Sequence, residues 1–339
     1  MPVQPRPKIA IIHPDLGWGG SEACALWAME ALKDDYDVCL ITSSAVEFKK
    51  LNEYYGTSIN SNQISVMTVS MPFILKKLNS FFALKYYRLA RFCKRRANEF
   101  DVMFSSYNPM DFSKKGVQYI LDPTFTCDLL QLCAGYPRGL RGWFYQNSPW
   151  RRFYLNLSKT LSNLTEEGIK KNLTLVDSDW TGQLTSEVYG MKSTTVYPPV
   201  PSNYPQVNWE DREDGFVCIG RINSEKRIDK IIEILEEVRK RKKEIHFHII
   251  GKIHDLKYAR NVNQLLRKNQ DWIFMEGEVA SDRKIELVAK HKYGIHGRIN
   301  EPFGIAPAEM VKAGCIVWVA SGGGAGGGGE SSWSYLQGY

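Results

Sequence analysis

Two glutamates near the end of the chain, Glu301 and Glu309, are spaced so that they flank the start of a predicted helix. An apolar segment precedes them, and Pro302 stands where the first turn of a helix tolerates proline, so we predict a helix over residues 303–313. The amides and positive dipole end of such a helix attract anions. The carboxylates would lie roughly 10 Å apart along the axis, which suits a nucleotide diphosphate sugar. On spacing alone, Glu301 could instead merely complement the dipole, and Glu309 could be an ordinary exposed residue.

The residues around this pair resemble a known motif. The sequence Glu301-Pro-Phe-Gly-(x)4-Glu309, with His296 upstream and Ala313-Gly314 downstream, resembles the E-x7-E region of family 4 glycosyltransferases, which are retaining enzymes with the GT-B fold. The resemblance implies that Glu301 contacts the donor sugar, that Glu309 contacts the ribose, and that His296 lies near the sugar or a phosphate. Further substrate contacts are expected at the helix start, from Phe303, Gly304 and Ile305.

A second pair of residues, Arg221 and Lys226, is placed to bind the same diphosphate. They follow a predicted strand and precede a predicted amphipathic helix. Two cations and free amides around a helix start can hold a diphosphate and stabilise its leaving charge. The alternative is a helix that Ser224 caps, with solvated charges beside it. The sequence Gly-Arg-(x)4-Lys resembles the phosphate-binding pair of the same transferases, so we expect Arg221 and Lys226 to join His296 and Glu301 as catalytic residues.

A glycine-rich turn near the start of the chain is another candidate binding segment. A predicted strand over residues 8–13 is followed by Gly17, Gly19 and Gly20, and then by a predicted helix over residues 22–32. Glycines let the backbone approach a bound group closely, and the helix start favours an anion or a polyol. A plain strand-to-helix turn is the alternative. Because Gly-Gly-Ser-Glu resembles the N-terminal loop of the same transferases, we place Gly19 and Gly20 in the substrate site.

Polar residues at the ends of strands extend this candidate site. Strands over residues 38–42, 64–69, 102–105 and 117–121, with helical stretches between them, predict a parallel doubly wound sheet. Ligands of such sheets bind beyond the carboxyl ends of the strands, where the sequence has His13, Asn108, Asp122 and Thr124. The resembling transferases carry a histidine in a Tyr-Val-His context here, whereas this chain has Tyr119-Ile-Leu-Asp122. We place Asp122 in the substrate site, and the usual active-site histidine is missing.

The second half of the chain repeats this alternation after a proline-rich segment. A helix with Ser178 or Asp179 as its cap lies between predicted strands at residues 172–176 and 194–197. Residues 198–201, Pro-Pro-Val-Pro, then stiffen the chain as a hinge. Beyond the hinge we predict strands over residues 215–220, 245–251, 272–275 and 293–296, and helices over residues 227–240, 256–267 and 282–290.

The expected architecture is therefore α/β with the GT-B fold, in which two Rossmann-like doubly wound domains face each other across a cleft. We predict an N-terminal, acceptor-side domain over residues 1–200 and a shortened, nucleotide-sugar-binding domain over residues 201–319. Residues 320–339 are rich in glycine and serine and are predicted to form a flexible tail.

The net charge of +7 favours an anionic partner, and the positive charge is concentrated in one segment. No acidic residue lies between Glu53 and Glu99, whereas eight lysines and arginines lie among the leucines and aromatic residues of segment 76–96. Segment 138–159 mixes arginines with aromatic residues in the same way. These segments suit a surface that rests on anionic lipid headgroups, or the mouth of an acceptor site. The alternative is sheet-covering helices with a solvated basic side. No nucleic-acid recognition motif accompanies the charge.

The composition excludes several other classes. No apolar run is long enough to span a bilayer and no signal peptide is present, so we expect a cytoplasmic protein, at most peripheral on the inner face of a membrane. The seven scattered cysteines contain no C-x-x-C pair, and we expect neither a disulfide framework nor a zinc site. His246 and His248 share one face of a strand, but without a third ligand nearby we interpret them as packed or surface residues.

Together, the motifs and their resemblance to family 4 glycosyltransferases imply an enzyme that transfers a hexose with retention from a UDP- or GDP-sugar to a lipid-linked or saccharide acceptor. Arg221, Lys226 and the helix amides can neutralise the leaving diphosphate, so we expect no metal ion and no cofactor. Two alternatives remain. One is a nucleotide-sugar-binding protein without turnover, which the missing histidine and the unusual C-terminus favour. The other is a GT-B sugar epimerase, for which further acid-base carboxylates are lacking.

Overall fold

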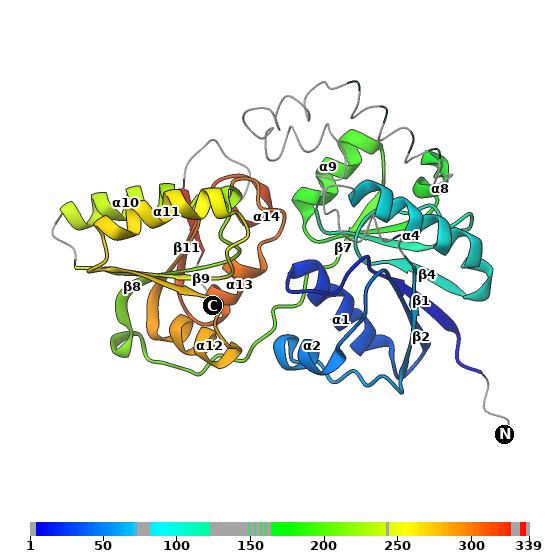
Figure 1. Cartoon of the computed structure of the whole chain (residues 1–339), viewed down its shortest axis with the longest axis horizontal. Helices are drawn as coiled ribbons and strands as arrows, with labels where there is room; N and C mark the ends of the chain where they lie inside the picture. Colours follow the sequence, from blue (N-terminus) through cyan, green and yellow to red (C-terminus); the bar gives the residue numbers. More distant parts are fainter. Residues whose placement is uncertain are drawn as a thin grey trace. The chain divides into compact units, whose positions relative to one another are not determined.

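The computed structural model describes residues 5–70, 72, 82–122, 149, 153, 157, 160, 164–241, 244–326 and 333–336. The chain divides into two compact units, Met1–Pro199 and Val200–Tyr339, each built on its own sheet (Figure 1). The division falls within the proline-rich segment 198–201, one residue before the boundary that the sequence suggests.

The sheet of the first unit has seven parallel strands in the order β3-β2-β1-β4-β5-β6-β7. The strands are β1 (Lys8–Ile12), β2 (Asp37–Thr42), β3 (Ile64–Thr68), β4 (Val102–Ser105), β5 (Val117–Ile120), β6 (Leu173–Val176) and β7 (Ser193–Thr195). The order reverses between β1 and β4, as in a doubly wound sheet that binds ligands at that point. The predicted parallel α/β sheet is confirmed.

Helices cover both faces of this sheet, because alternate residues of a strand point to opposite sides. In β1, Ile9 and Ile11 pack with α1 (Gly20–Leu32) and α2 (Phe48–Tyr55), whereas Ala10 and Ile12 pack with α4 (Phe82–Arg96). The other described helices of the unit are η2 (Ala97–Glu99), α8 (Glu166–Lys170) and α9 (Asp179–Tyr189). The Ser178 hydroxyl accepts a hydrogen bond from the Thr181 amide, which confirms the predicted cap of α9.

The second unit is built on a sheet in the order β10-β9-β8-β11-β12-β13, in which only β13 is antiparallel to its neighbour. The strands are β8 (Glu213–Ile219), β9 (His246–Ile250), β10 (Ile273–Gly277), β11 (His291–His296), β12 (Ile316–Ala320) and β13 (Trp333–Leu336). Strand β11 lies at the centre of this sheet, where the order reverses. Its carboxyl end is therefore the place where a doubly wound sheet binds its ligand.

Two layers of helices enclose the second sheet. Helices α10 (Ile228–Lys240) and α11 (Leu256–Lys268) pack on one face through residues such as Ile231 and Val262, and Figure 1 shows them side by side. Helices α12 (Ser281–Lys290) and α13 (Ile305–Lys312) pack on the other face through Leu287 and Met310. Short turns of helix complete the unit, namely η4 (Trp209–Asp211), η5 (Ser224–Lys226) and α14 (Gly323–Gly326).

Two local predictions and one alternative differ from the structure. Helix α13 begins at Ile305 rather than at residue 303, because Gly304 adopts a left-handed conformation (φ 85°) that a regular helix cannot contain. Ser224 does not cap α10; the Asn223 side chain instead accepts a hydrogen bond from the Lys226 amide and closes η5. The predicted flexible tail contains ordered structure, since β13 pairs with β12 along Ala320 to Val317 and α14 follows β12.

No helix in the described part of the chain has the length and apolar character needed to cross a membrane.

Candidate functional site

The candidate site lies where β11 ends at His296. Gly297 then turns the chain so tightly against η5 that a Cβ atom there would lie 2.6 Å from the carbonyl oxygen of Lys226. Asn300 adopts a left-handed conformation with φ of 54° and directs the chain back toward the sheet. This turn places Glu301 beside His296 at the end of β11. It also places Glu301 beside Lys226, which lies 75 residues earlier in the chain.

Glu301 is the centre of a cluster of four side chains. Its Oε2 atom lies 2.9 Å from Lys226 Nζ and 2.7 Å from His296 Nε2, and its Oε1 atom accepts a 3.1 Å hydrogen bond from Arg298. The four side chains are at most 17% exposed. With His296 neutral, two cations and one carboxylate leave the cluster with a net positive charge. A negatively charged ligand beside it would therefore be stabilised.

The protonation states of this cluster follow from its contacts. Burial by itself would raise the pKa of Glu301, but the positive charge of Lys226, the hydrogen bond from His296 and the charge of Arg298 hold that pKa well below its usual range. Burial, followed by the charge of Lys226, lowers the pKa of His296. At neutral pH the pair is thus an ionised carboxylate beside a neutral imidazole.

The neutral His296 has one ring nitrogen ready for a further hydrogen bond. An ionised carboxylate can only accept, so His296 donates from Nε2 to Glu301 and carries its lone pair on Nδ1. That Nδ1 atom is buried and has no hydrogen-bond partner among the described residues. A buried polar atom without a partner is costly, and a ligand hydroxyl could satisfy it.

The start of α13 follows Glu301 directly. Gly304 is the N-cap residue, no side chain caps the helix, and Pro307 has no amide hydrogen, so the amides of Ile305 and Ala306 are left at the helix end. A glycine-rich loop after β12 packs against the same place: the Gly324 amide donates to the Glu301 carbonyl, and a Cβ atom on Gly323 would lie 2.3 Å from that oxygen. This loop includes Ser321-Gly322-Gly323, part of the predicted tail.

Glu309 and Arg221 lie in different surroundings from Glu301. Glu309 is buried in α13 and forms a 2.7 Å ion pair with Lys284 of α12. It is therefore not the ordinary exposed residue that its spacing allowed. Arg221 is exposed just beyond β8, two positions past Ile219, and has no ion pair or hydrogen bond with the described residues. Phe303 is half-buried between Glu301 and α13.

In the first unit, the glycine turn is fixed by a tyrosine from α2. The Tyr55 hydroxyl lies 2.7 Å from the Gly19 amide and 3.0 Å from the carbonyl oxygens of Gly17 and Gly19. Gly19 is the N-cap residue of α1 and Gly20 is its first residue. A Cβ atom on Gly19 would lie 2.5 Å from the Glu22 carboxylate, which bonds the Ser21 hydroxyl. The carboxylate makes this turn better suited to hydroxyl groups than to an anion.

Asp122 and His13 lie at the carboxyl edge of the first sheet. Asp122 is half-buried two residues beyond β5, and His13 follows β1, two strands away in the sheet. His13 is 1% exposed, and burial lowers its pKa to about 4. Its ring packs edge-on against Tyr107. Thr124 lies outside the described residues, as does the aromatic-basic segment 138–159 except for residues 149, 153 and 157.

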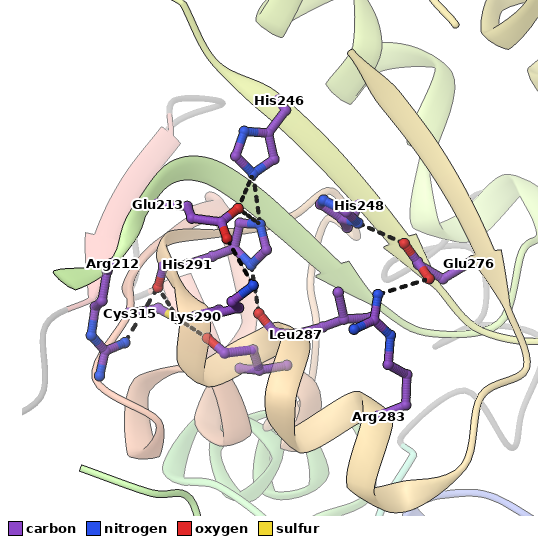
Figure 2. Close-up of polar contacts among 11 residues, drawn as sticks. Arg212, Glu213, His246, His248, Glu276, Arg283, Leu287, Lys290, His291 and Cys315 are labelled. Carbon is purple, nitrogen blue, oxygen red and sulfur yellow. Dashed lines mark hydrogen bonds and ion pairs between the residues drawn. The ribbon is translucent and has the colours of Figure 1, made fainter. Parts of the chain in front are cut away.

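Three partners in the second unit were not identified from the sequence. Arg298 lies only three residues before Glu301 in the chain, but the pairing depends on the turn at Asn300 and not on a helix. Lys284, the partner of Glu309, gives no local signal. The third is His291, which lies 2.7 Å (Nε2 to Nε2) from His246. The interpretation of His246 and His248 as residues without a third ligand nearby is therefore wrong, since His291 completes a cluster (Figure 2).

Comparison with known proteins gives this arrangement a family context. Residues 201–326, which contain both the Arg221–Lys226 and the Glu301–Glu309 pairs, match the family model described as glycosyl transferases group 1. The structure of Anabaena HepE in complex with UDP and glucose superposes with a TM-score of 0.61 at 15% identity, over 94% of this chain and 82% of HepE. The fold is GT-B.

Other GT-B structures agree with this assignment. WaaG, a glycosyltransferase involved in lipopolysaccharide biosynthesis, has a TM-score of 0.62 at 13% identity and covers 93% of this chain and 82% of its own. Sucrose-phosphate synthase from Thermosynechococcus elongatus has a TM-score of 0.61 at 14% identity, with coverages of 94% and 82%. No curated protein sequence matches the chain significantly. At these identities the likeness establishes the GT-B fold.

Proposed function

We propose that this chain is a retaining glycosyltransferase of the family 4 type, which transfers a hexose from a UDP- or GDP-sugar without a metal ion. The observation that carries the proposal is the contact between Lys226 and Glu301, which joins the two sequence motifs across 75 residues at the carboxyl end of β11. HepE, which has the same fold, has been solved with UDP and glucose and with UDP-glucose.

The diphosphate is assigned to the positive side of the Glu301 cluster. The cluster has two positive charges, from Lys226 and Arg298, and one negative charge, from Glu301. Exposed Arg221 adds a further positive charge, and the amides of Ile305 and Ala306 lie at the start of α13. As the bond between the sugar and the diphosphate breaks, the leaving group gains negative charge, which these preorganised groups stabilise. These groups supply the positive charge that a metal ion would otherwise place beside the leaving diphosphate.

The sugar and the ribose are assigned to the two glutamates. Glu301 accepts hydrogen bonds from sugar hydroxyls, and the lone pair on His296 Nδ1 accepts one more. Glu309 accepts from the ribose hydroxyls, and its contact with Lys284 holds the carboxylate in place. We name no nucleophile, because no further carboxylate stands beside this cluster in the described part of the chain.

The acceptor is assigned to the first unit. Gly19, Gly20 and the nearby Glu22 carboxylate suit the hydroxyl groups of a saccharide or of a lipid-linked sugar, and Asp122 lies at the same edge of the sheet. On α4, Arg88, Arg91 and Arg95 are exposed and follow one another at helical spacing, so they form one basic face. We assign this face to anionic lipid headgroups at the inner surface of a membrane.

A thermal-shift screen with UDP-, GDP- and ADP-sugars tests the donor assignment. A ligand that binds only the folded protein raises the melting temperature, so one base should give a clear shift and the others little. The stabilising donor is then incubated with and without candidate acceptors, and the anomeric configuration of the product is determined. An inverted product, or a reaction that stops on adding EDTA, would contradict the proposal.

A nucleotide-sugar-binding protein without turnover is the second candidate. Leu121 and Asp122 stand where the resembling transferases carry a histidine, and this substitution favours the alternative. Donor hydrolysis separates the two. An enzyme hydrolyses the bound donor slowly in the absence of acceptor, whereas a binding protein shows the thermal shift and no release of free sugar.

A further inference from the structure

The cluster formed by His246, His248 and His291 lies at the amino end of the second sheet. His246 is the first residue of β9 and His291 the first residue of β11, so both lie at the edge opposite to His296. A ring nitrogen of each of the three lies within 4.8 Å of those of the other two. Strand β11 has six residues, so this cluster lies roughly 17 Å from the Glu301 cluster.

A carboxylate lies beside two of these three rings. Glu213, the first residue of β8, places Oε2 3.2 Å from His246 Nε2 and 3.8 Å from His291 Nε2, and these two nitrogens are 2.7 Å apart. Donor atoms around a tetrahedral zinc ion lie roughly 3.3 Å apart, as follows from zinc-to-donor distances near 2.0–2.1 Å. The three observed separations bracket that value, so small side-chain shifts would let one ion enter.

Hydrogen bonds orient the rings as ligands. His291 donates from Nδ1 to the Leu287 carbonyl at the end of α12, which leaves the lone pair of the neutral ring on Nε2, facing His246. His248 Nδ1 lies 2.7 Å from Glu276 Oε1, the carboxylate-histidine contact that supports metal ligands in many proteins. Figure 2 shows these contacts.

One carboxylate oxygen of Glu213 faces the rings. In Glu213, Oε1 lies 3.1 Å from Lys290, which leaves Oε2 on the side of the histidines. The Nε2 atoms of His246 and His291 face each other at 2.7 Å. At this distance one of the two Nε2 atoms carries a proton that it donates to the other, and this proton belongs to His246 because His291 carries its own proton on Nδ1. Once the His246 proton moves to Nδ1 of that ring, both Nε2 atoms present lone pairs and can bind a metal ion.

The neighbouring cysteine is not part of this donor set. Burial raises the pKa of Cys315 to about 12, and its thiol donates to the backbone carbonyls of Val288 and His291. The donors are therefore three imidazoles and one carboxylate, which suit zinc among the abundant divalent ions and do not suit magnesium or calcium.

The sheet leaves space for the His246 ring. Gly215 of β8 pairs with His246 of β9, and a Cβ atom on Gly215 would lie 2.3 Å from the Nε2 atom of that ring. A side chain at position 215 would thus displace the ring from its neighbours. The glycine, the three histidines and the carboxylate together form a built site.

We propose that His246, His248, His291 and Glu213 bind one zinc ion that holds together the amino ends of β8, β9 and β11. The site takes no part in sugar transfer, because it lies at the opposite edge of the sheet from Glu301. His246 and Glu213 are partly exposed, with 26% and 42% of their side chains accessible, so the ion enters from solvent.

Calorimetric titration of full-length, untagged protein with zinc chloride tests the proposal after dialysis against EDTA and then against metal-free buffer. We expect one zinc ion per chain, an absorption spectrum typical of four-coordinate cobalt when cobalt replaces zinc, and a melting temperature roughly 5–10 °C higher at saturating zinc. Absence of zinc binding by the folded wild-type protein would overturn the proposal.

Variants locate the ion. His246→Ala should weaken zinc binding by about 100-fold or more, and Glu276→Gln, which changes only the support of His248, by about 10–100-fold. His254→Ala is the matched control, because His254 is exposed and outside the cluster. Equal affinity in His246→Ala and His254→Ala would show that the ion binds elsewhere.

A variant that keeps all of the proposed ligands tests the site without the risk that loss of a buried ligand unfolds the protein. Gly215→Ala should lower zinc affinity by about 10-fold or more by displacing the His246 ring, while the metal-free variant keeps a cooperative melting transition. His291 is 1% exposed, so His291→Ala is interpreted only if its circular dichroism spectrum matches that of the wild type. Unchanged zinc affinity in a folded Gly215→Ala protein would contradict the assigned geometry.

Discussion

Strand β11 begins with His291 and ends with His296, and each imidazole lies beside a carboxylate. At the carboxyl end, His296 Nε2 is 2.7 Å from Glu301, whose oxygens also contact Lys226 and Arg298. At the amino end, His291 Nε2 is 3.8 Å from Glu213 Oε2 and 2.7 Å from the Nε2 atom of a second histidine. Both histidines are 1% exposed, so burial does not distinguish them.

The neighbours of the two histidines assign different chemistry to the same residue type. Two cations surround the carboxylate at the carboxyl end, and the cluster has an excess of positive charge that suits an anionic ligand. At the amino end, imidazole nitrogens and one carboxylate oxygen face each other, with one lysine beside the carboxylate, and we assign this end to a metal cation. A histidine near a carboxylate therefore indicates neither function until the charges around the pair are known.

The largest expected effect is that of Glu301→Gln at the carboxyl end. The amide keeps the shape of the side chain but removes the charge that balances Lys226 and Arg298, and it weakens acceptance of sugar hydroxyls. We expect the transfer rate to fall on the order of 1000-fold. Steady-state kinetics with the stabilising donor measure this, and Glu233→Gln, an exposed partner of Lys230, is the control. A rate near that of wild type would remove Glu301 from the proposed mechanism.

Lys226→Met should lower the turnover number by about 100-fold, with a smaller effect on donor affinity. The lost charge acts mainly when the diphosphate leaves, whereas Arg221 and Arg298 still hold the bound donor. Lys230→Met serves as the control, because Lys230 lies in α10 and half of its side chain is exposed. If Lys226→Met lowered only the affinity, the lysine would contribute to binding and not to the departure of the diphosphate.

Glu309→Gln should weaken nucleotide binding by about 10-fold, the effect of one hydrogen bond to a charged group. It also leaves Lys284 buried without its ion partner and should lower stability. The double variant Lys284→Met, Glu309→Leu separates these effects, because it removes both charges and should recover part of the stability without nucleotide affinity. Binding is measured by calorimetry. Recovery of affinity in the double variant would show that Glu309 has only a structural role.

The smallest expected effect concerns the pH dependence of stability. Because the folded pKa of His296 lies below the unfolded value near 6.5, the unfolded chain binds more protons, and the unfolding free energy falls as pH drops below about 6.5. His296→Gln keeps a donor toward Glu301 and should reduce this slope, by at most about 1.4 kcal/mol per pH unit. Denaturant unfolding in EDTA between pH 7 and 5 measures it, with exposed His254→Gln as the control. An unchanged slope would show that the pKa of His296 is the same in the folded and unfolded states.

The sequence was sufficient to predict the doubly wound α/β architecture and most of the strands, but not β12 and β13. Apolar runs such as residues 8–13 form β1, and Ser178 caps α9, because these features depend on neighbouring residues alone. The helix after Glu301 was placed two residues early because the left-handed Gly304 is not visible in the apolar pattern.

The tail shows where composition misleads. Glycine-rich sequence predicts a flexible chain, yet Gly322 and Gly323 adopt left-handed conformations against Asn300 and Glu301, where a Cβ atom on either would overlap them. The glycines are required by close packing in this loop. The residues 333–336 that follow form β13 because they find an exposed edge of the sheet at β12, and composition does not reveal such an edge.

The sequence by itself determined the residue types and the local elements: Glu301 and Glu309 around a helix, a basic pair after a strand, and histidines at the ends of strands. Only the tertiary structure decided their partners. Parallel strands bring together residues far apart in the chain, so Lys226 reached Glu301, Lys284 reached Glu309, and His291 reached His246 across 45 residues. The register that makes these contacts is set by packing of the whole sheet, and no local pattern encodes it.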